Sequence, residues 1–225
     1  MISIYNNIVK LGDLSDEIKN IYEDRYELKQ FEIDNSLDVL KKTLDELKDD
    51  LFVNVEHPYV DKIYRDSYYN YFASKRDSFS RDTIRLSFFT TKIENKDFRD
   101  NDKLNDLKDN YLGFIVLRPT FPQIIGRTVI RKDALKRTNF ITSGVTYNST
   151  VNGIKLDVFG FPHSSQDSET ISCAETTVWS LLEYFGFKYP EYKPLLPSII
   201  NDVLGKYSTE RLIPSNGLTA GQIAY

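Results

Sequence analysis

The first regular hydrophobic pattern lies in the charged region between positions 14 and 51. Its leucines are spaced by three or four residues: Leu37, Leu40, Leu44, Leu47 and Leu51. This spacing places them on one face of a helix, with Ser36 as the expected N-cap. The stripe is shorter than the three or four heptads typical of a coiled coil. We therefore expect an amphipathic helix that packs on the rest of the chain, with a partner-binding helix as the alternative.

Further along, the pattern changes to short runs that are rich in β-branched and aromatic residues. Runs bounded by Gly, Pro or Asn predict strands at 83–90, 111–117, 126–130, 140–147 and 153–159. Asn152-Gly153 joins the last two runs and is typical of a two-residue hairpin turn. Aromatic residues at helical spacing within 64–72 predict a helix with a core-facing aromatic side, and the polar segment 95–110 predicts a loop or a short exposed helix.

The C-terminal part of the chain is expected to be helical again. A helix is predicted at about 172–185, with Gly186 as its C-cap, and a shorter helix at about 198–204. Thr219 is placed to cap one more helix, which would be only in its second turn at Tyr225. We therefore expect that the natural protein continues past this point, or that a second chain completes the fold.

Together these patterns predict an α+β fold in three parts. They are an N-terminal helical segment over 1–55, a mixed strand-rich region over 56–161 and a helical region over 162–225. The chain contains no internal repeat, phosphate-binding loop or dinucleotide fingerprint.

Composition narrows the classes of function. The chain has 225 residues, with 29 Lys+Arg against 33 Asp+Glu, a net charge of −4 and a pI near 5.3. This acidic balance argues against a generic nucleic-acid binder, whose contact surface is usually basic. One cysteine and two histidines exclude an all-cysteine or histidine-rich metal site, so we expect neither a metal nor a cofactor. Without a secretory signal or an apolar run long enough to span a bilayer, the expectation is a soluble cytoplasmic protein that binds no membrane.

The single cysteine carries the most informative chemistry. Cys173 stands at the start of a predicted helix, where backbone N–H groups and the helix dipole favour the nucleophilic thiolate. The apolar residues of that helix are expected to form its buried side: Val178, Trp179, Leu181, Leu182 and Phe185. Gln166 lies seven residues upstream, and its side-chain amide is suited to donate to an oxyanion. We therefore expect Cys173 to face a cleft from a firmly packed helix.

The arrangement resembles the papain-like cysteine peptidase superfamily, in particular the bacterial peptidases that remove double-glycine leaders from bacteriocins. The likeness rests on Cys173 followed by Trp179, and on the segments 180–186 and 217–223. It covers about 162–225. The resemblance implies that this region is the central-helix half of a papain-like domain, and that the substrate is a peptide or protein.

The resemblance also implies site roles, with Cys173 as the nucleophile and Gln166 as the oxyanion donor. In the family the glutamine lies six residues before the cysteine, a spacing that Asp167 has here. The family's general base is a histidine that follows the cysteine. Both histidines of this chain, His57 and His163, precede it.

Three explanations for the missing base stay open. The chain as given ends before the histidine-bearing strands and has no peptidase turnover by itself, or a permuted arrangement uses His163 or His57 as the base. Alternatively, Cys173 is a buried structural thiol without peptidase activity. Outside such roles, His163 is interpreted as a loop residue and His57 as a residue at the start of a helix.

The leading hypothesis is a bacterial cysteine peptidase or peptidase-like protein. The alternative is a non-catalytic binding or assembly protein with a degenerate papain-like fold, which holds a partner protein through the leucine-striped N-terminal helix. The interspersed Asp and Arg residues of 65–85 predict a solvated, salt-linked face, and Arg118 and Arg127 are expected to form surface ion pairs.

Overall fold

The structure is a computed structural model, and it describes residues 5–75, 79–167, 169–170, 173–205 and 217–224. The fold is α+β, as the sequence predicts, because helices pack around antiparallel strands. Among the described residues, no helix is both long enough and apolar enough to cross a lipid bilayer.

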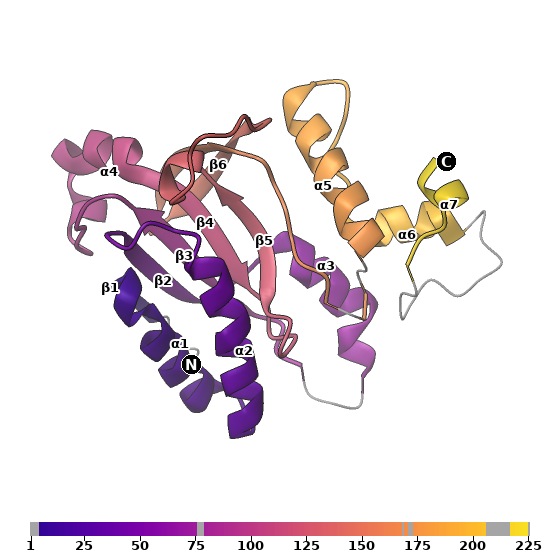
Figure 1. The fold of residues 1–225 in the computed structure, drawn as a ribbon, viewed down its shortest axis with the longest axis horizontal. Helices are drawn as coiled ribbons and strands as arrows, with labels where there is room; N and C mark the ends of the chain where they lie inside the picture. The colour runs from indigo at the N-terminus through magenta and orange to yellow at the C-terminus, as the bar shows by residue number, and fades with distance from the viewer. Residues whose placement is uncertain (1–4, 76–78, 168, 171–172, 206–216, 225) are drawn as a thin grey trace.

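A five-stranded antiparallel sheet forms the centre of the molecule, and its strands follow one another in chain order (Figure 1). The strands are β1 (Tyr5–Lys10), β2 (Phe52–Tyr59), β3 (Thr83–Phe89), β4 (Tyr111–Leu117) and β5 (Ile125–Ile130). The strand predictions at β3, β4 and β5 are confirmed. The pattern of the sequence does not predict β1 and β2. His57 lies within β2, so its predicted place at the start of a helix is wrong.

Two helices, α1 (Leu14–Arg25) and α2 (Gln30–Leu44), cover one face of the sheet. The leucine stripe lies in this core, which confirms that the segment packs on the rest of the chain. The helix is shorter than predicted. It ends at Leu44, and Leu47 lies beyond it in a β-bridge with Leu135.

Ser36 does not cap this helix as predicted. It lies inside α2, where its hydroxyl donates to the carbonyl oxygen of Glu32 at 2.6 Å. The helix begins seven residues earlier, where the carboxylate of Glu32 accepts from the backbone N–H of the N-cap residue Lys29 at 2.9 Å. The spacing of the leucines alone does not reveal these first two turns, because they precede the leucine stripe.

The opposite face of the sheet is covered by the hairpin of β6 (Val145–Val151) and β7 (Ile154–Gly160), with α4 (Leu104–Asn110) beside it. Asn152 and Gly153 have φ values of 47° and 87°, so the predicted two-residue turn is confirmed. The first strand of the hairpin begins later than the predicted 140–147.

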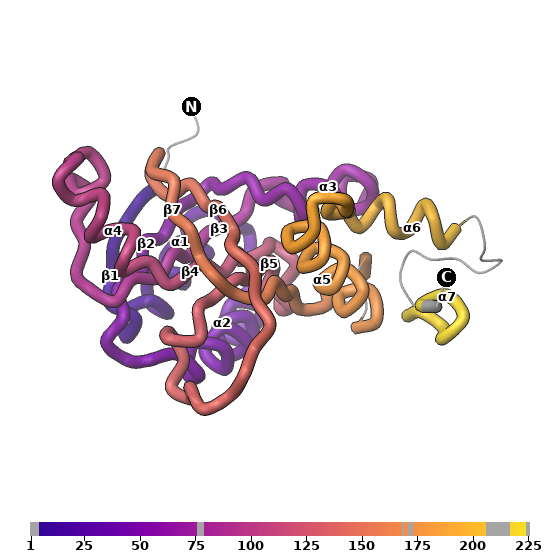
Figure 2. The backbone as a smooth tube through the Cα atoms, turned by 90° about the horizontal axis from the view of Figure 1, so that it is seen from above, coloured from indigo at the N-terminus to yellow at the C-terminus, as the bar shows by residue number. Residues whose placement is uncertain are grey.

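A third layer of helices lies beyond β5, on the side of the molecule away from α1 and β1 (Figures 1 and 2). It consists of α3 (Lys62–Asn70), α5 (Cys173–Lys188), α6 (Pro197–Gly205) and the short α7 (Ala220–Ala224). Trp179 forms the centre of its small core with Ile63 and Ile200. The sequence predicts α3, α5 and α6, and the predicted cap of α7 is present because Thr219 Oγ1 accepts from Gln222 N–H at 3.3 Å.

Short 3-10 helices complete the described structure at Leu11–Asp13, Phe72–Ser74, Asp97–Arg99, Asn101–Lys103 and Lys132–Ala134.

The polarity of α5 differs from the prediction. The sequence predicts Leu181 and Phe185 on its buried side, but they are 43 % and 40 % exposed. Apart from Trp179 and Tyr184, the buried side is polar and includes the fully buried Glu183. The regularly spaced residues Leu181 and Phe185 therefore lie on the outward face of this helix. The inward face carries Glu183, which meets charged partners on β5 and α3.

Gly186 also has a role other than the predicted C-cap, since α5 continues past it. A Cβ atom at this position would lie 2.5 Å from the backbone nitrogen of Pro194. Glycine is therefore needed for the close packing of the returning chain against α5.

Candidate functional site

The thiol of Cys173 is exposed at the first residue of α5. Its Sγ donates to the side-chain Oε1 of Gln166 at 2.9 Å. Trp179 is only 2 % exposed and holds the helix in its core. The predictions that Cys173 begins a helix and that Trp179 is buried are both confirmed. The interpretation of Cys173 as a buried thiol is wrong, because the residue is exposed.

The side chain of Gln166 reaches the sulfur despite the seven-residue separation. Half a turn of its terminal amide exchanges Oε1 for Nε2 at the same position. The amide can thus accept from a neutral thiol, or donate to a thiolate or to an oxyanion formed beside it. The structure therefore brings the side chain of Gln166 into contact with Cys173, as the sequence pattern predicts.

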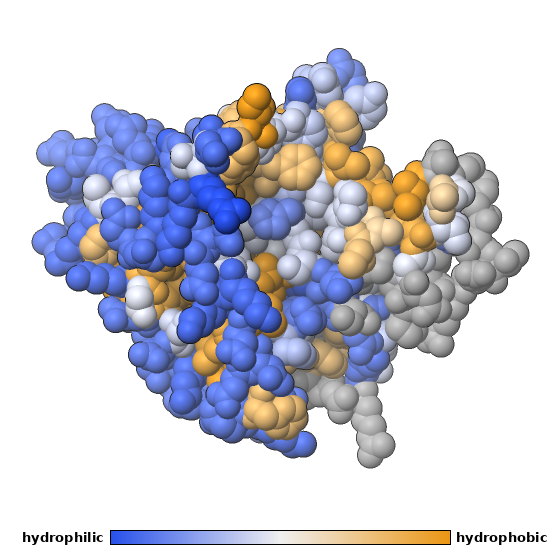
Figure 3. Space-filling model, in the orientation of Figure 1, coloured by the Kyte–Doolittle hydropathy of each residue, from blue (hydrophilic) through white to orange (hydrophobic). Residues whose placement is uncertain are grey.

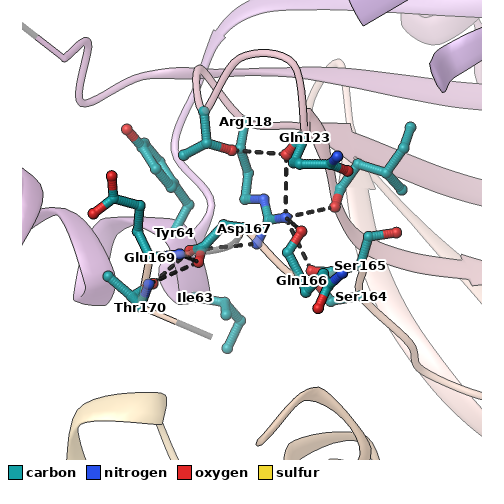
Figure 4. Close-up of polar contacts among 12 residues, drawn as sticks. Ile63, Tyr64, Arg118, Gln123, Ser164, Ser165, Gln166, Asp167, Glu169 and Thr170 are labelled. Atoms are coloured by element: carbon teal, nitrogen blue, oxygen red, sulfur yellow. Dashed lines mark hydrogen bonds and ion pairs between the residues drawn. The ribbon is translucent and has the colours of Figure 1, made fainter. Parts of the chain in front are cut away.

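The guanidinium of Arg118 holds the segment that carries Gln166 (Figure 4). Its Nη2 donates to the carbonyl oxygens of Ser165 and Gln166 at 3.0 and 3.4 Å, and to that of Ile125 at 2.8 Å. Arg118 is 4 % exposed, so the prediction of a surface ion pair is wrong for this residue. Its hydrogen bonds join the backbone of the site to the edge strand β5.

The carboxylate of Asp167 is engaged by the backbone that leads into α5 (Figure 4). Its Oδ1 accepts from the N–H groups of Glu169 and Thr170 at 3.0 and 2.8 Å, and the hydroxyl of Thr170 donates to Oδ2. Asp167 has the family's spacing to the cysteine, but these contacts give it the role of stabilising the turn.

Glu169 ties the same turn to the chain that follows α3. The hydroxyl of Tyr71 and the ammonium of Lys75 both donate to its Oε2, the latter at 2.9 Å. These hydrogen bonds lower the pKa of the Glu169 carboxyl. Two sets of contacts therefore hold residues that precede Cys173 in the chain. Arg118 binds the backbone of Gln166, and Tyr71 and Lys75 bind the side chain of Glu169.

His163 lies in the extended segment between β7 and Gln166. Its backbone pairs with Thr128 of β5 through two hydrogen bonds, of 2.8 and 3.0 Å. Desolvation by the neighbouring protein lowers the pKa of the His163 imidazole, although the residue as a whole is exposed. A neutral imidazole is the form that accepts a proton. In the described part of the chain no hydrogen bond joins this imidazole to the thiol, whose recorded partner is Gln166.

His57 is remote from this arrangement. It is 8 % exposed in β2, and its Nε2 lies 3.2 Å from the hydroxyl oxygen of Tyr26. Burial lowers its pKa. His57 is therefore part of the packing between the sheet and α1, and the structure does not bring it to Cys173.

An ion pair supports α5 from its buried side. Oε1 of the fully buried Glu183 accepts from Nη2 of Arg127 at 2.7 Å, and Nζ of Lys62 lies 3.6 Å from the same oxygen. The guanidinium of Arg127 also lies over the rings of Phe114 and Tyr147. The ion pair predicted for Arg127 therefore forms, but around a buried carboxylate instead of on the surface.

The predicted salt-linked face of 65–85 is present in part. Arg65 and Asp82 pair at 2.7 Å near the surface. Arg85 is instead buried and donates to Glu56 at 2.7 Å. Residues 76–77 of this face lie outside the described residues.

Sequence reasoning missed Arg118 and Glu183 as supports of the site. A signal existed for each: Arg118 follows directly on a strand of apolar residues, and Glu183 interrupts an apolar helix. A charged side chain among buried apolar residues is costly unless it is paired or hydrogen-bonded, so each of these residues is expected to have a partner.

No group of three or more His, Cys, Asp or Glu side chains in the described ranges is arranged to hold a metal ion. Comparisons of the chain with protein-family models, with curated proteins and with solved structures found no match.

Proposed function

We propose that the chain carries the nucleophile of a papain-like cysteine peptidase, with Cys173 as the attacking group and Gln166 as the oxyanion partner. One observation carries this proposal. An exposed thiol begins a helix and contacts a side-chain amide whose backbone is anchored by a buried arginine. A thiol in such a position has access to substrate and a donor for developing charge.

The proposed reaction is acyl transfer. The thiolate of Cys173 attacks the peptide carbonyl carbon, and the carbonyl oxygen becomes an oxyanion that the amide of Gln166 stabilises. The C–N bond then breaks, the amine leaves with a proton, and a thioester remains until water hydrolyses it. The leaving amine needs a proton donor, which histidine usually provides.

We propose that this proton donor lies outside the described contacts of Cys173, on a histidine-bearing continuation or a second polypeptide. The 225-residue chain alone is then expected to show no turnover on a peptide panel, although its thiol reacts with iodoacetamide. Adding a longer polypeptide that supplies the histidine should restore cleavage. If the chain alone cleaves peptides and His163→Ala abolishes the cleavage, His163 is the base instead.

A second candidate function, binding or assembly, is favoured by an apolar surface on the third layer of helices (Figure 3). Its exposed side chains are Leu181, Phe185, Phe187, Tyr189, Tyr192, Ile199 and Val203. Three of them, Phe185, Tyr189 and Tyr192, line a cavity of about 660 Å³. Clustered exposed apolar groups of this kind mark interaction surfaces.

This surface differs from the partner site predicted at the N-terminal helix, whose leucines lie in the core. The two candidate functions separate in one experiment. Phe185→Asp should disrupt partner binding or self-association and leave labelling of Cys173 intact. Alkylation of Cys173 should abolish peptidase activity in the complete system and leave association unchanged.

A further inference from the structure

Three neighbouring depressions of the surface meet end to end beside β5. The first, of about 420 Å³, shares Lys132 and Thr142 with the second, of about 450 Å³. The second shares Phe161 and His163 with the third, of about 250 Å³. The shared side chains place the three depressions in a row along β5, and we call this row the β5 groove.

The lining of the β5 groove changes along its length. The first depression is charged and polar, with Arg131 and Asp157 in its walls. The second has aliphatic and aromatic walls that include Leu47, Leu135 and Phe140. The third combines hydroxyl side chains, such as those of Ser164 and Thr177, with Phe161 and Leu181, and its surface is mainly apolar. A ligand that fills the groove must therefore be polar at one end and mainly apolar over the rest of its length.

The third depression lies against the first turns of the helix that begins at Cys173. It contains Thr176 and Thr177, whose hydroxyls donate to the carbonyl oxygen of Cys173 at 2.8 and 2.9 Å. These residues lie one helical turn from the exposed thiol. His163 stands where the second depression meets the third, and its backbone is fixed to β5.

We infer that the β5 groove binds an extended polypeptide, with a bulky apolar side chain in the second depression and the chain directed past His163 toward Cys173. The elongated outline favours an extended chain over a compact ligand. The aliphatic walls of the middle depression favour a polypeptide side chain over a sugar. The inference names a substrate geometry for the proposed function and rests on that function for the chemistry at Cys173, whereas binding itself can be measured separately.

Binding is tested with the Cys173→Ala protein, which keeps the groove and removes the nucleophile. A library of random decapeptides displayed on phage is selected on this protein, and fluorescein-labelled copies of the enriched peptides are titrated. We expect enrichment of peptides with Leu, Phe or Tyr at one fixed position. Failure to enrich any peptide, or enrichment without such a position, would overturn the inference.

Two groove variants and one control locate the binding site. Thr43→Trp places a large side chain from α2 into the second depression, and it should weaken binding at least tenfold. Phe140→Ala removes a 40 % exposed wall residue and should weaken binding several-fold with little effect on folding. Thr150→Trp adds the same bulk at an exposed position of β6 outside the groove and should leave affinity unchanged. Equal affinity of both groove variants and the parent protein would overturn the inference.

The outcomes also separate this inference from the proposed function. Peptides that bind the groove but are never cleaved, even when a histidine-bearing polypeptide is supplied, would refute the peptidase and leave the groove. Peptides that are cleaved at equal rates by the parent protein and by Thr43→Trp would refute the groove and leave the peptidase.

Discussion

Arg118 and Asp167 lie 4.0 Å apart between Nη1 and Oδ2, and both are almost completely buried. Each of the two charged side chains also forms hydrogen bonds with the backbone. The arginine donates to carbonyl oxygens, and the aspartate accepts from backbone N–H groups of the next turn. The pair therefore fixes the backbone on both sides of Gln166, and with it the direction from which the amide reaches Cys173.

Arg118→Met should destabilise the protein by about 3–5 kcal/mol, because it leaves the buried carboxylate and several carbonyl oxygens without their donor. Arg118→Lys should be less stable than the parent protein but more stable than Arg118→Met, since one ammonium cannot reach all of these acceptors. Urea unfolding measures both changes. A loss below about 1 kcal/mol for the Met variant would show that Arg118 is not a support of the site.

Gln166→Glu should slow alkylation of Cys173 by iodoacetamide at pH 7 by roughly five- to tenfold. A carboxylate at the position of the amide opposes the thiolate by about 1 kcal/mol at a solvent-exposed site. The rate is followed by mass spectrometry, which is unambiguous because the chain has one cysteine. Gln30→Glu on the surface of α2 adds the same charge and should leave the rate unchanged. Equal rates in the two variants would contradict the contact between Gln166 and the sulfur.

Arg127→Met should cost about 3–5 kcal/mol, because Glu183 is fully buried and Lys62 is more distant than Arg127. Removing both charges, as Arg127→Met with Glu183→Met, should cost less than the sum of the single changes by about 1–3 kcal/mol. The double-mutant cycle is measured by urea unfolding. Simple additivity would show that the two side chains do not interact.

Stability should fall as the pH decreases from about 7 to about 5. Burial holds the pKa of His57 below its ordinary value near 6.5, so the unfolded chain binds more protons than the folded protein in this range. The free energy of unfolding therefore rises with pH through this window. His57→Gln should flatten the slope. His163 contributes with the same sign, and His163→Gln is the comparison. A slope unchanged by His57→Gln would contradict the prediction.

Gly186→Ala should destabilise the protein by about 1–3 kcal/mol, even though alanine favours helix over glycine by about 1 kcal/mol. The added Cβ meets the backbone of Pro194 at 2.5 Å, and the clash exceeds the gain in helix propensity. Gly221→Ala in α7 is the matched control, since its nearest atom would lie 4.0 Å away. Thermal unfolding measures both. A stabilising Gly186→Ala would mean that the returning chain moves aside without cost.

The parts of the fold that the sequence predicts are those set by local pattern. β4 is a run of apolar residues buried on both faces, and the hairpin turn at Asn152-Gly153 needs residues that tolerate positive φ. The position of Cys173 at a helix start follows from a local pattern as well. Each of these features depends on residues that are close in the sequence.

The parts that the sequence does not predict depend on distant partners. The inward face of α5 is polar because Glu183 meets Arg127, which lies on another element. Leu181 and Phe185 carry the period of a buried face and yet remain exposed. Arg118 could not be assigned to the site, because the carbonyl oxygens of Ser165 and Gln166 that it binds come from a segment far along the chain.

The central sheet and the cysteine-bearing helix are held by different kinds of contact, and this has a consequence for local opening of the molecule. Backbone hydrogen bonds join all five strands of the sheet, and an apolar core covers each of its faces. The helix α5 docks instead through side-chain contacts, such as Arg127 to Glu183, and through a small apolar core around Trp179. Segments with few buried apolar contacts open most readily, so this helix can undock while the sheet remains intact. Backbone amides of α5 should then exchange with deuterium through this partial opening, faster than those of β3 and β4, and each opening takes the site around Cys173 apart.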